Sequence, residues 1–131
     1  MGSLADIRVL IVEDEAMLVL ELQDLLADFG CRIAGKAARL SDAVQLASVT
    51  DCDVAILDIN LSGERVDPVA DILHRRGIPF IFATGYGGDG LNPEHRSVLL
   101  VEKPYNSETL RTALIEVLLK RAAPSRDCSR I

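Results

Sequence analysis

The sequence near its start reads Ile7-Arg8-Val9-Leu10-Ile11-Val12-Glu13-Asp14, an apolar and largely β-branched run that ends in two carboxylates. The run shows almost no alternation of polar and apolar residues, which is typical of a strand buried on both faces of a parallel sheet. Four further apolar runs follow at residues 31–37, 53–58, 78–83 and 97–101. They alternate with segments of helical period, so the order predicts an α/β fold, a five-stranded parallel sheet covered by helices on both faces.

Capping residues indicate where the helices between these strands should begin and end. The first predicted helix spans residues 15–28 and ends at Gly30, and the second is capped by Ser41 and reaches Val49. The third is capped by Asp67, has Pro68 in its first turn and ends at Gly77. The last spans about 108–121 and is capped by Asn106 or Ser107. Residues 60–65 are expected to form a polar loop. The glycine-rich stretch 85–93 leaves any helix after it short, beginning near Pro93.

The composition and charge of the chain indicate how many domains, which partners and which compartment to expect. The chain has 131 residues, 49% of them hydrophobic, which suits one folded domain over residues 1–123 and a flexible polar tail over 124–131. Its 14 basic and 20 acidic residues give a net charge of −6, so we expect no nucleic-acid partner. No apolar run approaches the roughly 20 residues of a membrane span, so we expect no membrane partner. Three cysteines without C-x-x-C spacing fit a reducing cytoplasm better than a disulfide framework or a zinc site.

Polar residues close four of the five predicted strands. They are Glu13, Asp14, Asp58, Thr84 and Lys103. Ligands of open α/β sheets bind outside the carboxyl ends of the strands, so these side chains should share one pocket. Carboxylate oxygens suit Mg²⁺, an aspartate can attack phosphorus as a nucleophile, and a lysine and a hydroxyl can stabilise the charged phosphoryl oxygens. The pattern therefore predicts a divalent-metal and phosphoryl site.

These residues resemble the response-regulator receiver domain of bacterial two-component signalling. The acidic pair lies in Val-Glu-Asp-Glu, the accepting aspartate in Ile-Leu-Asp58-Ile-Asn-Leu, the hydroxyl residue in Phe-Ala-Thr84-Gly-Tyr, and the lysine in Lys103-Pro104. The resemblance covers about residues 7–121. Residues 79–86, Pro-Phe-Ile-Phe-Ala-Thr-Gly-Tyr, are similar to the "FAT GUY" subgroup of largely single-domain receivers.

The resemblance implies a flavodoxin-like, doubly wound fold with strand order 2-1-3-4-5. It implies phosphorylation of Asp58 by a sensor histidine kinase or a phosphotransfer protein, and a cis peptide bond before Pro104. Mg²⁺ would be held by Glu13, Asp14, Asp58 and the Asn60 carbonyl, while Thr84 and Lys103 would receive the phosphoryl oxygens. The protein would be a regulator that catalyses only its own phosphorylation and dephosphorylation. Because no output domain is expected, the output would be binding of a downstream protein target, with at most a weak homodimer.

One departure from the family pattern concerns the output. Receivers commonly carry an aromatic switch residue three positions before the lysine, where this chain has Leu100. We therefore expect Thr84 and Tyr86 to act as the switch, with the glycine-rich segment that follows them.

Two other functions fit the same residues. A phosphate sink or a scaffold with a weakly active site would carry the same side chains. A haloacid-dehalogenase-type phosphatase also uses an aspartate nucleophile, but it normally has a second aspartate two residues later, where this chain has Asn60.

Overall fold

The computed structural model describes residues 4–84 and 100–122. Its main sheet contains five parallel strands, in the order β2-β1-β3-β6-β7. Their bounds are β1 Arg8–Val12, β2 Arg32–Ala37, β3 Val54–Asp58, β6 Phe80–Thr84 and β7 Leu100–Glu102. Counted along the chain this is the predicted order 2-1-3-4-5, so the predicted doubly wound α/β fold is confirmed.

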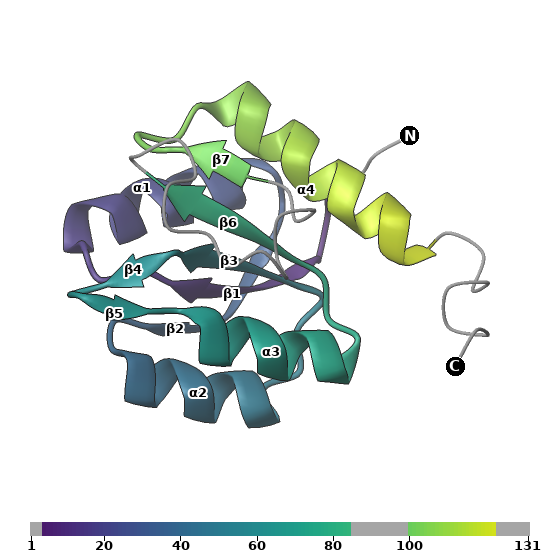
Figure 1. Ribbon diagram of the computed structural model, residues 1–131. Coiled ribbons are helices and arrows are strands. Elements are labelled where there is room, and N and C mark those ends of the chain that lie inside the picture. The colour runs from purple at the N-terminus through teal and green to yellow at the C-terminus, as the bar shows by residue number, and fades with distance from the viewer. Residues whose placement is uncertain (1–3, 85–99, 123–131) are drawn as a thin grey trace.

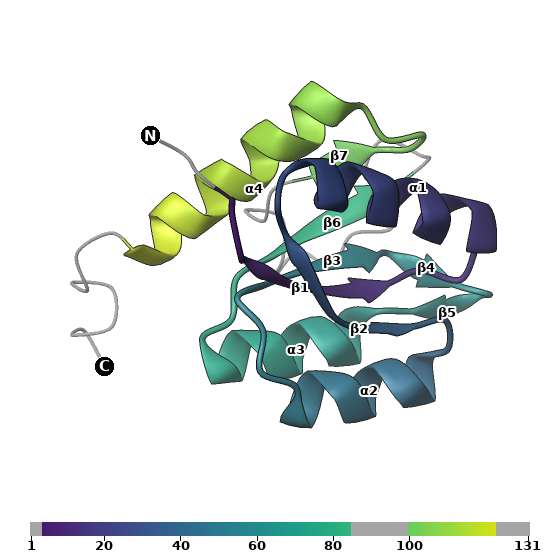
Figure 2. The same cartoon turned by 180° about the vertical axis from the view of Figure 1, so that it is seen from behind.

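Helices cover both faces of the sheet. The helices are α1 Ala16–Asp28, α2 Leu40–Val49, α3 Asp67–Arg76 and α4 Ser107–Ala122. Figures 1 and 2 show α1 and α4 on one face of the sheet and α2 and α3 on the other. Each central strand sends alternate side chains to the two faces, as in β3, where Leu57 packs on the α2–α3 side and Ile56 on the α1–α4 side. Burial on both faces explains why these strands read as continuous apolar runs.

Two predicted helix caps are wrong. Helix α2 begins at Leu40, one residue before Ser41, after the extended residue Arg39 and without a side-chain cap. Helix α3 begins at Asp67, so this residue lies inside the first turn and Val66 occupies the cap position. The Asp67 carboxylate instead accepts a hydrogen bond from Nε of Arg65 at 2.9 Å. Each helix begins earlier than its predicted cap because the first helical backbone bonds run to earlier carbonyls: the N–H of Ala43 donates to Arg39 at 2.9 Å and the N–H of Ala70 to Val66 at 3.2 Å.

The C-terminal helix follows the predicted pattern. Oδ1 of Asn106 accepts a hydrogen bond from the backbone N–H of Thr109 at 3.0 Å, which caps α4. The predicted short helix near Pro93 lies outside the described residues.

Residues 60–65 form a hairpin where a polar loop was expected. Two short antiparallel strands, β4 Asn60–Leu61 and β5 Glu64–Arg65, pair with each other and leave Ser62 and Gly63 as a two-residue turn. Both turn residues have positive φ, 51° and 91°. Two positive φ values are typical of the tight turn that suits the twist of a hairpin. The hairpin directly follows β3 and lies beside the carboxyl end of the sheet (Figure 1).

Candidate functional site

The carboxyl ends of the parallel strands bring the predicted polar residues to one edge of the sheet. Glu13 and Asp14 follow β1, Asp58 is the last residue of β3, Thr84 is the last of β6, and Lys103 follows β7. In the sheet, Val12 pairs with Leu57, so the next residues along each strand, Glu13 and Asp58, are neighbours.

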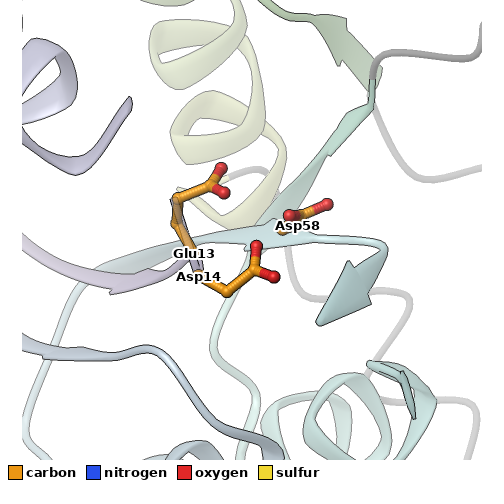
Figure 3. Close-up of side chains that lie close together, drawn as sticks. All are labelled: Glu13, Asp14 and Asp58. Carbon is orange, nitrogen blue, oxygen red and sulfur yellow. The ribbon is translucent and has the colours of Figure 1, made fainter. Parts of the chain in front are cut away.

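Three carboxylates converge at this edge. One oxygen each of Glu13, Asp14 and Asp58 can be chosen so that all three lie within 4.8 Å of one another. Figure 3 shows the three side chains gathered at the end of β3. Glu13 is 1% exposed and Asp58 is 6% exposed. Burying like charges this close together is unfavourable unless a cation or a proton offsets the repulsion.

Lys103 supplies one positive charge to the cluster. Its Nζ lies 3.1 Å from Oδ2 of Asp58, 3.3 Å from Oε1 of Glu13 and 3.7 Å from Oε1 of Glu15. Glu15 was not among the predicted site residues. The lysine therefore bridges the strand-three aspartate and the acidic segment after β1, from a position 45 and 90 residues away along the chain.

The ionisation of the cluster follows from burial and charge. Burial raises the pKa of Glu13 from its ordinary 4.5 to about 7; the charge of Asp58 adds to this, and Lys103 opposes it. Burial also raises the pKa of Asp58, although Lys103 acts against it. Burial acts to lower the pKa of Lys103, but the two carboxylates outweigh it and raise the value. Without a bound cation, Glu13 thus takes up a proton at a much higher pH than an ordinary glutamate does.

Asp14 differs from the other two carboxylates because the hairpin turn holds it. Its Oδ2 accepts hydrogen bonds from both the backbone N–H and the hydroxyl of Ser62, at 2.9 and 2.8 Å. Burial acts to raise the pKa of Asp14, but these bonds to the charged form outweigh it and lower the value. Ser62 was not predicted, and only the Ser-Gly dipeptide, a turn signal, pointed to this segment.

Tyr105 is a second contact that the sequence did not reveal. Its buried hydroxyl donates a hydrogen bond to Oε1 of Glu13 at 3.3 Å, and its backbone N–H donates to Oε1 of Glu21, also at 3.3 Å. Burial, followed by the charge of Glu13, raises the pKa of Tyr105. Its place directly after Lys103-Pro104, whose peptide bond is cis, was the only signal in the sequence.

The donor set fits a hard divalent cation. All three converging side chains offer oxygen, which is the ligand type that Mg²⁺ and Ca²⁺ prefer. A cation bound here would also offset the burial and the repulsion by Asp58 that raise the pKa of Glu13. Asn60 lies next to the cluster, since its backbone N–H donates to Oδ1 of Asp58 at 3.3 Å.

Comparison with known proteins shows the family to which the chain belongs. Residues 9–115 match the response regulator receiver domain family. The chain belongs to this family. The predicted resemblance is therefore confirmed, and the acidic edge described above is the carboxyl edge of a receiver.

The receiver is similar to solved and curated relatives. The solution structure of SdrG from Sphingomonas melonis is 35% identical with a TM-score of 0.77, over 91% of this chain and 99% of that one. The receiver domain of PhyR from Erythrobacter litoralis is 33% identical with a TM-score of 0.75, over 94% and 98%. The transcriptional regulatory protein PdtaR of Mycobacterium tuberculosis is 30% identical over 118 residues, which cover 87% of this chain and 57% of that protein. The receiver thus spans about half the length of the curated relatives that it matches.

The predicted switch residues are only partly described. Thr84 is buried, its carbonyl accepts a hydrogen bond from the backbone N–H of Lys103 at 2.9 Å, and Asp58 pairs with the preceding residue, Ala83. Tyr86 lies outside the described residues. Leu100, which stands where many receivers have an aromatic residue, begins β7 and is half-buried. Among the helices of residues 4–84 and 100–122, none has the length and apolar character of a membrane span.

Proposed function

We propose that this receiver is a phosphorylation-controlled switch in which Asp58 accepts a phosphoryl group. The observation that carries the proposal is the position of Asp58, which closes β3 beside the carboxylates of Glu13 and Asp14 and 3.1 Å from the ammonium group of Lys103. Membership of the receiver family over residues 9–115, the range that contains these side chains, supports it.

The proposed reaction transfers a phosphoryl group from a histidine nitrogen to an aspartate oxygen. A carboxylate oxygen of Asp58 attacks the phosphorus of a phosphohistidine on a sensor histidine kinase or a phosphotransfer protein. The new O–P bond forms as the P–N bond breaks, and the imidazole nitrogen leaves with the electron pair. The product is an acyl phosphate on Asp58. Phosphoryl transfer depends mainly on positioning and on stabilising charge over the equatorial oxygens.

Each neighbouring side chain has a role in this transfer. Lys103 offers its ammonium group, now shared by Asp58 and Glu13, to a phosphoryl oxygen. The Thr84 hydroxyl, at the end of the adjacent strand, is the second donor. Glu13, Asp14, Asp58 and the Asn60 carbonyl would hold Mg²⁺, which when bound supplies positive charge against the phosphoryl oxygens. Lys103 and Thr84 would then stabilise oxygens that the cation leaves exposed.

The output that fits this chain is a change in protein binding. We infer that residues 1–123 act as the receiver in the cytoplasm, with 124–131 as a tail, and that Thr84 and Tyr86 transmit phosphorylation to a downstream protein. SdrG, 34% identical with a TM-score of 0.73, has a solution structure in a BeF3-activated conformation, and this similarity supports an activation-dependent change of conformation in the present receiver. The receiver regulates by its own phosphorylation state and turns over no other substrate.

Intact-protein mass spectrometry tests the proposal. The receiver is incubated with acetyl phosphate and Mg²⁺, or with acetyl phosphate and EDTA. We expect one acid-labile phosphoryl group with Mg²⁺ and none with EDTA. Asp58→Asn should remain unmodified, and Asp42→Asn, an exposed aspartate on α2, should behave as wild type.

Three results would contradict the proposal. A phosphoryl group on Asp58→Asn would place the acceptor elsewhere. Continuous release of phosphate without a stable adduct would favour the phosphatase. No adduct on wild type would favour the scaffold with a weakly active site.

A further inference from the structure

The turn of the β4–β5 hairpin contains a residue that is poorly suited to its backbone. Asn60 pairs with Arg65 and Leu61 with Glu64, so Ser62 and Gly63 make the tight turn. Such turns favour Asn-Gly or Gly-Gly, because both central residues have positive φ. Ser62 has φ 51°, which is unfavourable for a residue with a side chain other than Asn or Asp. A contact elsewhere must offset this strain.

The contact is with Asp14. Ser62 gives that carboxylate two hydrogen bonds on one oxygen, Oδ2, from its N–H at 2.9 Å and its hydroxyl at 2.8 Å. Both donors of one residue therefore converge on the same atom, across 48 residues of sequence. A glycine at this position would keep the N–H bond and relax the turn, but it would lose the hydroxyl bond.

The hairpin is anchored on one side more than on the other. The N–H of Gly63 donates to Oδ1 of Asn60 at 2.7 Å, which fixes the turn internally. On the α2 side the hairpin borders an open cavity of about 680 Å³, lined by Leu61, Ser62 and Glu64 together with residues of α2. Leu61, which is 1% exposed, anchors the base of the hairpin in the core, and the two hydrogen bonds of Ser62 tie the turn to Asp14.

We propose that Ser62 is a positioning residue that holds Oδ2 of Asp14 and so presents the other carboxylate oxygen, Oδ1, to a divalent cation. The inference rests on the proposed function, since it takes Asp14 as a ligand of Mg²⁺. Groups that orient a metal ligand commonly change metal affinity 10- to 100-fold when they are removed. Because Ser62 is exposed, its hydroxyl should contribute less, about three- to tenfold.

Two substitutions separate the hydroxyl from the turn. Ser62→Gly removes the hydroxyl and relaxes the backbone, whereas Ser62→Thr keeps the hydroxyl and increases the strain, because β-branched residues disfavour positive φ. Ser48→Ala is the control: this hydroxyl bonds the carbonyl of Val44 within α2, away from Asp14. Mg²⁺ affinity is measured for each protein by titration of backbone amide signals in NMR, and thermal melting without metal reports stability.

We expect the Mg²⁺ affinity and the melting temperature to change independently of each other in the two Ser62 variants. Ser62→Gly should raise the Kd for Mg²⁺ about three- to tenfold with a melting temperature near that of wild type. Ser62→Thr should keep the Kd within about twofold although it melts at a lower temperature. Ser48→Ala should keep the wild-type Kd.

Three outcomes would overturn the inference. A wild-type Kd in Ser62→Gly would show that the hydroxyl does not position Asp14. A Kd that follows the melting temperature across the variants would assign Ser62 a purely structural role. If wild type binds no Mg²⁺, this inference and the metal site of the proposed function both fail, whereas an unchanged Kd in Ser62→Gly overturns this inference alone and leaves that site intact.

Discussion

Replacing Glu13 with glutamine in the metal-free receiver should remove much of the pH dependence of its stability. Burial and the neighbouring Asp58 raise the pKa of Glu13 from 4.5 to about 7 in the folded protein. Between these two pH values the folded state binds more protons than the unfolded chain, so the free energy of unfolding falls as pH rises. The stability that protonated Glu13 contributes is complete below pH 4.5 and is lost above about pH 7.

The size of the effect follows from the two pKa values. They differ by about 2.5 pH units, from 4.5 to about 7. At about 1.4 kcal/mol per pH unit this corresponds to about 3 kcal/mol. Glu13 is 1% exposed, so solvent screening does not reduce the figure appreciably. Between pH 5 and pH 8.5 most of the difference, about 2 to 3 kcal/mol, should be visible.

Urea unfolding in EDTA measures this pH-dependent difference in the free energy of unfolding. We expect the stability of wild type relative to Glu13→Gln to fall by about 2 to 3 kcal/mol from pH 5 to pH 8.5, a relative shift of roughly 1–2.5 M in the urea midpoint. Glu116→Gln, at an exposed position on α4, should show no such relative change. Equal differences between wild type and Glu13→Gln at both pH values would refute the argument from burial and repulsion.

Three further substitutions test other parts of the account. Asp58→Asn removes one converging carboxylate at nearly constant shape, so the metal-free variant should melt at or above the wild-type temperature; a clear drop would count against a repulsive acidic cluster. Tyr105→Phe removes the hydroxyl that bonds Glu13 at 3.3 Å and should lower the free energy of unfolding by about 0.5–1.5 kcal/mol in chemical denaturation; an unchanged value would mean that the bond contributes nothing. Gly77→Ala places a side chain at φ 73° with open space around its Cβ, so the loss should be purely conformational, about 1 kcal/mol; a much larger loss would indicate a clash that the structure lacks.

The fold could be predicted from the sequence because burial of a strand determines which of its residues must be apolar. Strands β1, β3 and β6 are buried on both faces, so their residues are apolar without alternation. The site could be predicted for the same reason: a charged residue such as Asp58 at the end of an apolar run is conspicuous, and parallel topology places all such ends at one edge.

The side-chain hydrogen bonds of the site could not be predicted from the sequence. Ser62 reaches Asp14 across 48 residues and Tyr105 reaches Glu13 across 92. Topology limits which loops meet, but the atoms that bond depend on side-chain packing. The hairpin was missed because its strands have two residues each and its turn contains serine in place of the asparagine or glycine that usually marks such turns. The caps at Ser41 and Asp67 were wrong because the first helical backbone bonds already run to the carbonyls of Arg39 and Val66, which places both predicted caps inside their helices.

The phosphoryl acceptor can be identified chemically. Borohydride reduces the acyl phosphate of an aspartate to homoserine, so the receiver is treated with acetyl phosphate and Mg²⁺, reduced, digested and sequenced by tandem mass spectrometry. The account predicts homoserine at position 58 and aspartate at positions 14 and 53. Homoserine at another aspartate, or unmodified Asp58 in protein that carries a phosphoryl group, would contradict it.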